Sequence, residues 1–311
     1  MLLLNILIIV VCLVVLIFGA SFIVEGAARL ARKLGISELV IGLTIVAIGT
    51  SAPEFAVTVA AALRGQADIS VSNVVGSNIF NLGFILGGVA AITAIHTSRR
   101  LVFRDGGLLI ATTLLLLFFL RDLELQQWEG GVLFTLLIVY IVYLIYQREA
   151  PEDDLPEGEF QWLDIPRLIV GLVMVVAGGH YLVDAAVEIA RSVGVSEWAI
   201  GVTIIAAGTS MPELVTSLLA AIRGHEGLSI GNLIGSDLFN LLGVLGMAGI
   251  LQTQPMIIDT AGRSSVMLLS AMVILVVILM RTGWKLSRGE GLLLVGINLV
   301  RWYADFQSGS Q

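Results

Sequence analysis

Ten long apolar stretches divide this chain of 311 residues, and they constrain its fold more than any other feature of the sequence. Apolar residues make up 57% of the chain and charged residues only 13%, far outside the composition of a water-soluble globular domain. Most of the stretches approach the roughly 20 residues that a helix needs to cross a bilayer. We therefore expect an all-α integral membrane protein with ten transmembrane helices, near residues 3–28, 38–63, 69–95, 106–120, 127–146, 165–190, 197–222, 228–251, 264–280 and 290–303.

The basic residues predict how the chain lies in the membrane. With ten spans, twelve of the 17 Lys and Arg residues fall on one side, and Arg64, Arg121, Arg191, Arg263 and Arg301 fall on the other. The side richer in Lys and Arg is usually cytoplasmic. We therefore expect a multi-pass protein of the cell (inner or plasma) membrane with both termini outside.

The sequence contains an internal duplication. Residues 19–87 align with 178–246 without a gap and match at about 31 of 69 positions. Each half carries five spans, an odd number, so the second half should enter the membrane inverted relative to the first, as in many secondary transporters. We expect a first inverted repeat at 1–147, an acidic cytoplasmic linker at 148–164 and a second inverted repeat at 165–311.

Each half places one acid inside an apolar stretch. The motif GTSAPEF at residues 49–55 recurs as GTSMPEL at 208–214, and the two motifs supply Glu54 and Glu213. A carboxylate at membrane depth costs several kcal/mol unless it faces a cavity, a partner or an ion, so such an acid indicates a functional site.

The prolines of these motifs predict that spans 2 and 7 are broken helices. Pro53 cannot donate to the carbonyl of Gly49, and Pro212 has the same relation to Gly208. Inside a membrane, a carbonyl left free in this way is tolerated only where it is buried in protein or lines a polar cavity.

Helical spacing gathers further oxygen atoms around each acid. Thr50 and Thr209 each lie four residues before a glutamate, on the same helix face. All these donors are hard oxygens, which suit Ca²⁺ or Na⁺ better than Zn²⁺ or copper. Two carboxylates can neutralise one Ca²⁺ or two Na⁺, so competition for them gives a physical basis for exchange. The following spans add two polar stripes, Asn73, Ser77 and Asn81 in the first half and Asn232, Ser236 and Asn240 in the second.

Each of these sequence features, taken alone, has a structural role as its alternative explanation, because a proline kink or a small-residue motif can simply serve helix packing. Recurrence of the whole set in both halves favours an ion site. Other polar residues are expected to be structural: Ser37 caps a helix, Glu25 and Asp184 pair near the membrane surface, and His225 is an ordinary loop residue.

The paired motifs GTSAPEF with GSNIFN and GTSMPEL with GSDLFN resemble the two repeats of the calcium/cation antiporter superfamily, and most of all its prokaryotic sodium/calcium exchangers. The resemblance implies two inverted five-helix repeats, a packed core of spans 2, 3, 7 and 8, and a sliding pair of spans 1 and 6. It also implies ion ligands. Glu54, Glu213, Thr50 and Thr209 would bind Ca²⁺, and the sodium sites would add the Ala47 carbonyl, Ser51, Ser77, the Ala206 carbonyl, Ser210 and Ser236, with Asn81 and Asn240 in the middle.

The chain departs from some relatives at the middle of this cavity. Potassium-dependent exchangers carry Asp where this chain has Asn240, so we expect no K⁺ requirement and weaker proton competition. A carboxylate appears instead at Asp237, about 100° away from the polar stripe, where a supporting or helix-contact role is favoured over direct ligation.

The sequence thus predicts a secondary antiporter that exchanges Ca²⁺ for Na⁺ by alternating access. It is expected to be no enzyme, to use no organic cofactor, and to have inorganic cations and lipid as its partners, with no nucleic acid and no obligate protein partner. A Ca²⁺/H⁺ antiporter is the nearest alternative, since buried carboxylates also take up protons. A passive cation channel is an alternative of a different class.

Overall fold

The computed structural model of the chain describes residues 2–147, 160–195, 200, 204, 206–252 and 255–308. Of the predicted linker at 148–164, residues 148–159 lie outside the described part.

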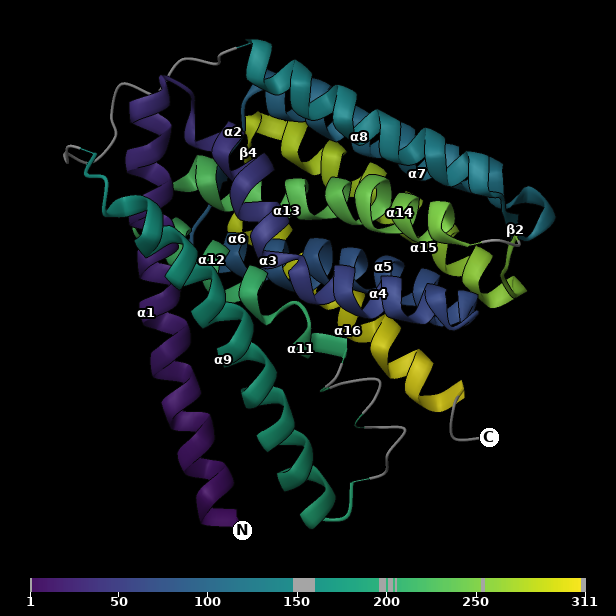
Figure 1. Cartoon of the computed structure of the whole chain (residues 1–311), viewed down its shortest axis with the longest axis horizontal. Coiled ribbons are helices and arrows are strands. Elements are labelled where there is room, and N and C mark those ends of the chain that lie inside the picture. Colours follow the sequence, from purple (N-terminus) through teal and green to yellow (C-terminus); the bar gives the residue numbers. More distant parts are fainter. Residues whose placement is uncertain are drawn as a thin grey trace.

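The first half of the chain is helical apart from two short strands (Figure 1). Its longest helix, α1, is followed by a span in several short pieces. One π-helical segment lies within that span, a second in the middle of the next span, and a third at the start of the one after it. The elements are α1 (Leu2–Leu34), α2 (Glu38–Ile41), a π-helical segment (Gly42–Val46), α3 (Ala47–Thr50), α4 (Ala52–Leu63), α5 (Ala67–Phe80), a π-helical segment (Asn81–Leu86), α6 (Gly87–Ile92), β1 (Ile95–His96), a π-helical segment (Leu101–Gly106), α7 (Gly107–Phe119), a 3₁₀ turn (Leu120–Asp122), β2 (Glu124–Leu125) and α8 (Gln127–Gln147).

The second half repeats this order. Its first long helix is α9, its broken span contains α11 and α12, and a π-helical turn again follows the next helix. The elements are α9 (Asp164–Ser192), α11 (Ala206–Gly208), α12 (Met211–Ile222), α13 (Glu226–Leu238), a π-helical segment (Phe239–Val244), α14 (Leu245–Leu251), β3 (Met256–Ile257), α15 (Thr260–Arg281), a 3₁₀ turn (Thr282–Trp284), β4 (Lys285–Leu286) and α16 (Arg288–Ser308).

Seven helical segments among the described residues are long and apolar enough to cross a membrane, or eight if the bent pair α2–α3 and α4 forms one span. The multi-pass membrane prediction is therefore confirmed, whereas two of the ten expected spans are not among these segments. In the span expected at 197–222, only the short apolar helix α12 is continuously described. The last expected span corresponds to α16, which carries Arg288 and Glu290 at its start and Arg301 near its end.

Burial separates central helices from peripheral ones. In the span formed by α13 and α14, 83% of the apolar window is buried, and in that of α5 and α6 the share is 72%. For α1 and α9 the shares are only 28% and 33%. These two long helices pack along each other at one edge of the molecule and cross the other helices steeply (Figure 1). They form a pair that stands apart from the centre.

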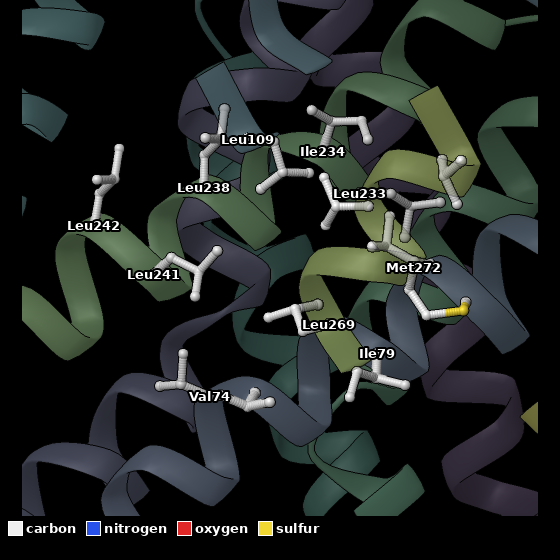
Figure 2. Close-up of a cluster of buried hydrophobic side chains, with 14 of the residues drawn as sticks. Val74, Ile79, Leu109, Leu233, Ile234, Leu238, Leu241, Leu242, Leu269 and Met272 are labelled. Atoms are coloured by element: carbon white, nitrogen blue, oxygen red, sulfur yellow. The ribbon is translucent and has the colours of Figure 1, made fainter. Parts of the chain in front are cut away.

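Apolar side chains from both halves of the chain fill the centre. Val74 and Ile79 of α5 meet Leu233 and Leu238 of α13, and Leu269 of α15 lies among them (Figure 2). All are almost completely buried. Because the two most buried helices come from opposite halves, neither half builds this core alone.

The broken helix predicted at the first motif is confirmed. The segments before and after Ser51 are bent by 52°, and Ser51 itself leaves the helical range with φ −81° and ψ 12°. Ser210 has nearly the same conformation, φ −91° and ψ 12°, at the start of α12. The break follows from Pro53 and Pro212, which stand in the first turn of the helix that begins there.

Glycines let α13 touch the backbone of the first broken span. A Cβ atom on Gly231 would lie 2.7 Å from the carbonyl oxygen of Leu39, and one on Gly235 would lie 2.6 Å from the Cα of Leu43. No side chain fits at such separations, so these helices approach as closely as their main chains allow.

Two antiparallel strand pairs connect the halves. Strand β1 pairs with β4, and strand β2 pairs with β3. Each pair takes one strand from before residue 148 and one from after residue 159. Apart from turns and short connections, the described part of the chain is therefore helical except for these two-residue strands.

We predict that Gly235→Ala destabilises the protein by about 1–3 kcal/mol, because the added methyl group would overpack the contact with Leu43. Gly76 aligns with Gly235 in the duplication, yet a Cβ there would meet nothing within 4 Å. Gly76→Ala is therefore the matched control and should leave the melting temperature in detergent unchanged or slightly raised. Equal melting temperatures for the two variants would contradict this account of the packing.

Candidate functional site

Glu54 and Glu213 lie at the centre of the molecule with no exposed surface. Each belongs to the first turn of the helix that follows a break, α4 for Glu54 and α12 for Glu213. The free N–H groups and the macrodipole at a helix start stabilise a negative charge. The breaks in the two spans therefore place both acids where the backbone favours an anion.

Each glutamate is held by hydroxyl groups of the opposite half. Ser51 Oγ donates to Glu213 Oε1 over 2.9 Å, and Ser210 Oγ donates to Glu54 Oε1 over 3.2 Å. The side chains of Thr50 and Thr209 also hydrogen-bond to Glu213 and Glu54, respectively. The two carboxyl groups act on each other by like-charge repulsion. The two GTS motifs therefore interlock around one pair of acids.

The second polar stripe joins this centre from α13. Thr50 Oγ1 lies 3.0 Å from Asn232 Oδ1 and 3.4 Å from Ser236 Oγ, and Ser236 Oγ lies 3.4 Å from Glu213 Oε1. Thr50 also lies 3.3 Å from the carbonyl oxygen of Ala47, one of the predicted sodium ligands. These contacts bring a hydroxyl, an amide, a carboxylate and a main-chain carbonyl to one place.

Four oxygen atoms of the predicted ligands are buried and have no hydrogen-bond partner among the residues that the structure describes. They are Glu54 Oε2, Glu213 Oε2, Asn81 Oδ1 and Asn240 Oδ1. A buried polar atom without a partner costs free energy, and its presence in a folded protein calls for an explanation such as a bound ion. These oxygens are the ligand type that Ca²⁺ takes, with six to eight of them in flexible geometry.

Two further predicted ligands, Ser77 and Ala206, belong to the same segments but are not connected to the glutamates by a described hydrogen bond. Ser77 is buried on α5, one turn before Asn81, and its main-chain carbonyl accepts from the backbone N–H of Asn81. Ala206 begins α11, two residues before the glycine of the second motif. The predicted residues thus lie along four segments that meet at the centre, although hydrogen bonds connect only part of the set.

Supporting contacts repeat in the two halves. Asn73 Nδ2 donates to Thr58 Oγ1 over 2.9 Å, and Asn232 Nδ2 donates to Ser217 Oγ over the same distance. Thr58 and Ser217 occupy aligned positions one turn after the glutamates. Sequence reasoning missed this pair, although it could have been found as the next polar residue on the helix face of each glutamate.

A cavity of about 540 Å³ reaches the second motif from one side of the molecule. It runs from Asp184 and Arg191 on α9 to Thr209 and Pro212, and it also touches Pro53. A smaller cavity of about 250 Å³ beside His96 and Glu226 contains none of the predicted ligands.

The corresponding approach, beside α1, is more tightly packed. In the duplication, the half-buried Val183 of the cavity aligns with Val24 on α1, which is completely buried. At the end of that approach, Arg223 Nη1 donates to Ser21 Oγ over 2.8 Å and lies 3.1 Å from Glu25 Oε1. The prediction that Glu25 pairs with another side chain is therefore confirmed.

Comparison with known proteins identifies the family. The family model described as "Sodium/calcium exchanger protein" matches residues 4–146 and 165–302. The chain is 39% identical over 314 residues to the putative antiporter CaxA of Alkalimonas amylolytica, with 96% of this chain and 98% of that protein covered. It is 32% identical over 335 residues to the sodium/calcium exchanger MaX1 of Methanosarcina acetivorans, with 94% and 95% covered.

A solved structure has the same fold over nearly the whole chain. The sodium-calcium exchanger NCX_Mj, soaked with Na⁺ and Sr²⁺, superposes with a TM-score of 0.84 at 29% sequence identity, covering 96% of this chain and 98% of that one. Taken with the family match, this superposition confirms the resemblance carried by the two motifs. The chain belongs to the sodium/calcium exchanger family, within the calcium/cation antiporter superfamily.

Proposed function

We propose that this protein exchanges Ca²⁺ for Na⁺ at one central site, whose ligands come from the twelve predicted residues around Glu54 and Glu213. Membership of the family supports cation antiport in general, and Ca²⁺ and Na⁺ are the ions its exchangers carry. The observation that carries the proposal is the reciprocal bonding of each buried glutamate to the opposite half, with one oxygen of each left unpartnered.

The neutral oxygens around the glutamates favour Na⁺ over H⁺ as the counter-ion. A proton needs only the carboxylates, whereas Na⁺ needs several oxygen ligands at once. Thr50 and Ser236 approach Glu213 together, and Thr209 and Ser210 approach Glu54. Two carboxylates with these hydroxyls can hold either one Ca²⁺ or two Na⁺. The same two negative charges cannot neutralise Ca²⁺ and Na⁺ at the same time.

We predict that Glu54→Gln and Glu213→Gln each reduce Na⁺-driven ⁴⁵Ca²⁺ uptake into proteoliposomes by at least about 10- to 100-fold. Mutation of a residue that only hydrogen-bonds to a metal ligand already causes a loss of that size. The amide keeps the shape of the side chain and removes the charge. Glu188→Gln is the control, because Glu188 is an exposed acid on α9 that pairs only with Arg191 among the described residues. Near-normal uptake by either central variant would refute the site.

The counter-ion is tested with the unmodified protein. We expect Ca²⁺ uptake to follow an imposed Na⁺ gradient and to stay at background with a pH gradient in Na⁺-free choline buffer. Uptake driven by the pH gradient alone would establish Ca²⁺/H⁺ exchange instead. Flux that continues without any counter-ion, with single-channel currents, would establish a channel.

For the architecture, we propose ten spans in two inverted five-helix repeats, 1–147 and 165–311. A cytoplasmic linker joins the repeats, and both termini lie on the outer side of the cell (inner or plasma) membrane. Contacts related by the duplication support it. Ser70 donates to the carbonyl of Thr58 over 3.1 Å, and Ser229 donates to the carbonyl of Ser217 over 2.8 Å. The β1–β4 and β2–β3 pairings likewise each join one strand of the first half to one strand of the second.

We also propose that transport proceeds by alternating access, with α1 and α9 as the moving pair. The open cavity beside α9 lies on the side predicted to be outside, and the more tightly packed approach beside α1 is fastened by Arg223 to Glu25. Arg64 and Asp184 occupy the aligned positions, yet Arg64 pairs with no described residue and Asp184 lies 3.4 Å from His180. In the inward-open state, Arg64 would bind Asp184 and the pairing of Arg223 with Glu25 would open.

We predict that Arg223→Ala loosens the approach beside α1. In a Cys12→Ala, Val24→Cys background, labelling by a charged water-soluble thiol reagent in detergent should rise by up to about fivefold, because a partly exposed ion pair contributes about 0.2–1 kcal/mol. Arg64→Ala is the matched control and should leave labelling unchanged. Equal labelling in both variants would contradict a fastening role for Arg223.

A further inference from the structure

Asp164 is a buried acid that the proposed ion site does not use. It is the first residue of α9, where the predicted linker ends, and only 1% of its side chain is exposed. Asp164 Oδ1 accepts from Arg29 Nη1 of α1 over 2.9 Å, and Asp164 Oδ2 accepts from the main-chain N–H of Gln161 over 2.8 Å. A buried acid thus ties together the two helices of the proposed moving pair, at the end predicted to be cytoplasmic.

Arg29 lies between this ion pair and the contact that fastens the approach beside α1. Its Nη2 atom is 3.7 Å from Glu25 Oε2, which is longer than a hydrogen bond. Glu25 Oε1 is bound instead by Arg223 Nη1 over 3.1 Å and by Ser21 Oγ over 3.0 Å. Glu25 therefore has two arginines within reach. Arg223 holds it, while Arg29 is held by Asp164.

The other end of the helix pair lacks this arrangement. In the duplication, Glu188 and Asp184 of α9 align with Arg29 and Glu25 of α1. Both aligned residues of α9 are acids, so the position that places an arginine one turn from Glu25 places a further negative charge one turn from Asp184. Glu188 pairs with Arg191 of its own helix. The choice between two arginines that Glu25 has is therefore not repeated by the aligned residues.

Burial favours Asp164 over Glu25 as the partner of Arg29. The side chain of Glu25 is 48% exposed, whereas that of Asp164 is almost fully buried. Charges that are shielded from water are screened less and attract each other more strongly. If the charge on Asp164 were removed, Glu25 would be the acid left within reach of Arg29 among the described residues.

We propose that Asp164 is a positioning residue for alternating access, which holds Arg29 away from Glu25 and so keeps Glu25 available to Arg223. When the approach beside α1 opens, Glu25 leaves Arg223 and takes Arg29 as its partner. The balance between the two states then depends on how firmly Asp164 holds Arg29. This inference rests on the proposed alternating access, in which Arg223 and Glu25 form the fastening contact.

The experiment measures how fast a charged water-soluble thiol reagent labels the Cys12→Ala, Val24→Cys protein in detergent. Each variant is compared with its own labelling after unfolding in SDS. We expect Asp164→Asn to raise labelling by up to about fivefold, the effect of losing one partly exposed ion pair, because Arg29 can then draw Glu25 away from Arg223. Asp164→Glu keeps the charge and should leave labelling at the parent level.

Arg29→Gln distinguishes positioning from a merely structural role. It breaks the same ion pair as Asp164→Asn, but it removes the competitor of Arg223. We therefore expect labelling to stay at the parent level or to fall, and the double variant Asp164→Asn, Arg29→Gln should behave like Arg29→Gln alone. Arg167→Gln is the matched control, because Arg167 lies 3.4 Å from Asp164 and is 47% exposed, and it should leave labelling unchanged.

A rise in labelling for Arg29→Gln would overturn the inference, because the ion pair would then only clamp α1 to α9. Unchanged labelling for Asp164→Asn, or an equal rise for Arg167→Gln, would overturn it as well. Failure of the proposed alternating access would look different, since Arg223→Ala itself would then leave the labelling of Val24→Cys unchanged.

Discussion

The reciprocal hydrogen bonds between Glu54 and Ser210, and between Glu213 and Ser51, are the interaction on which the rest of the structure depends. Two carboxyl groups that repel each other are buried at the centre of a membrane protein, where each would be costly alone. Hydroxyl groups of the other half and a helix start hold each of them. Because each acid also takes a hydroxyl donor from the other half, the halves must meet at this point.

Much of this site could be predicted from the sequence, because its chemistry is local. The break at Ser51 follows from Pro53, and a carboxylate inside an apolar stretch needs a polar neighbourhood whatever the surrounding fold. The duplication then required the same geometry at Ser210. The number of spans agrees less well with the prediction, because the charged residues at the ends of α16 weaken its apolar pattern.

The sequence could not predict contacts across the two halves between residues that the duplication does not align with each other. His225 was expected to be an ordinary loop residue, yet its ring nitrogen Nδ1 lies 2.8 Å from Glu38 Oε1 and both side chains are buried. Asp237 is similar, since its position off the polar stripe gave no sign that Asn81 of the other half would reach it. Helical periodicity describes one helix, and these pairings depend on how two helices cross.

The two strand pairs have a consequence for how the protein is made. Each pair draws one strand from the first half and one from the second, so β1 and β2 lack their strand partners while the first half is being synthesised. The partner of β2 is made before α15, and the partner of β1 only between α15 and α16. The contact between the two halves through these strands is thus completed late in synthesis, and a chain that ends after α8 would contain β1 and β2 without their partners.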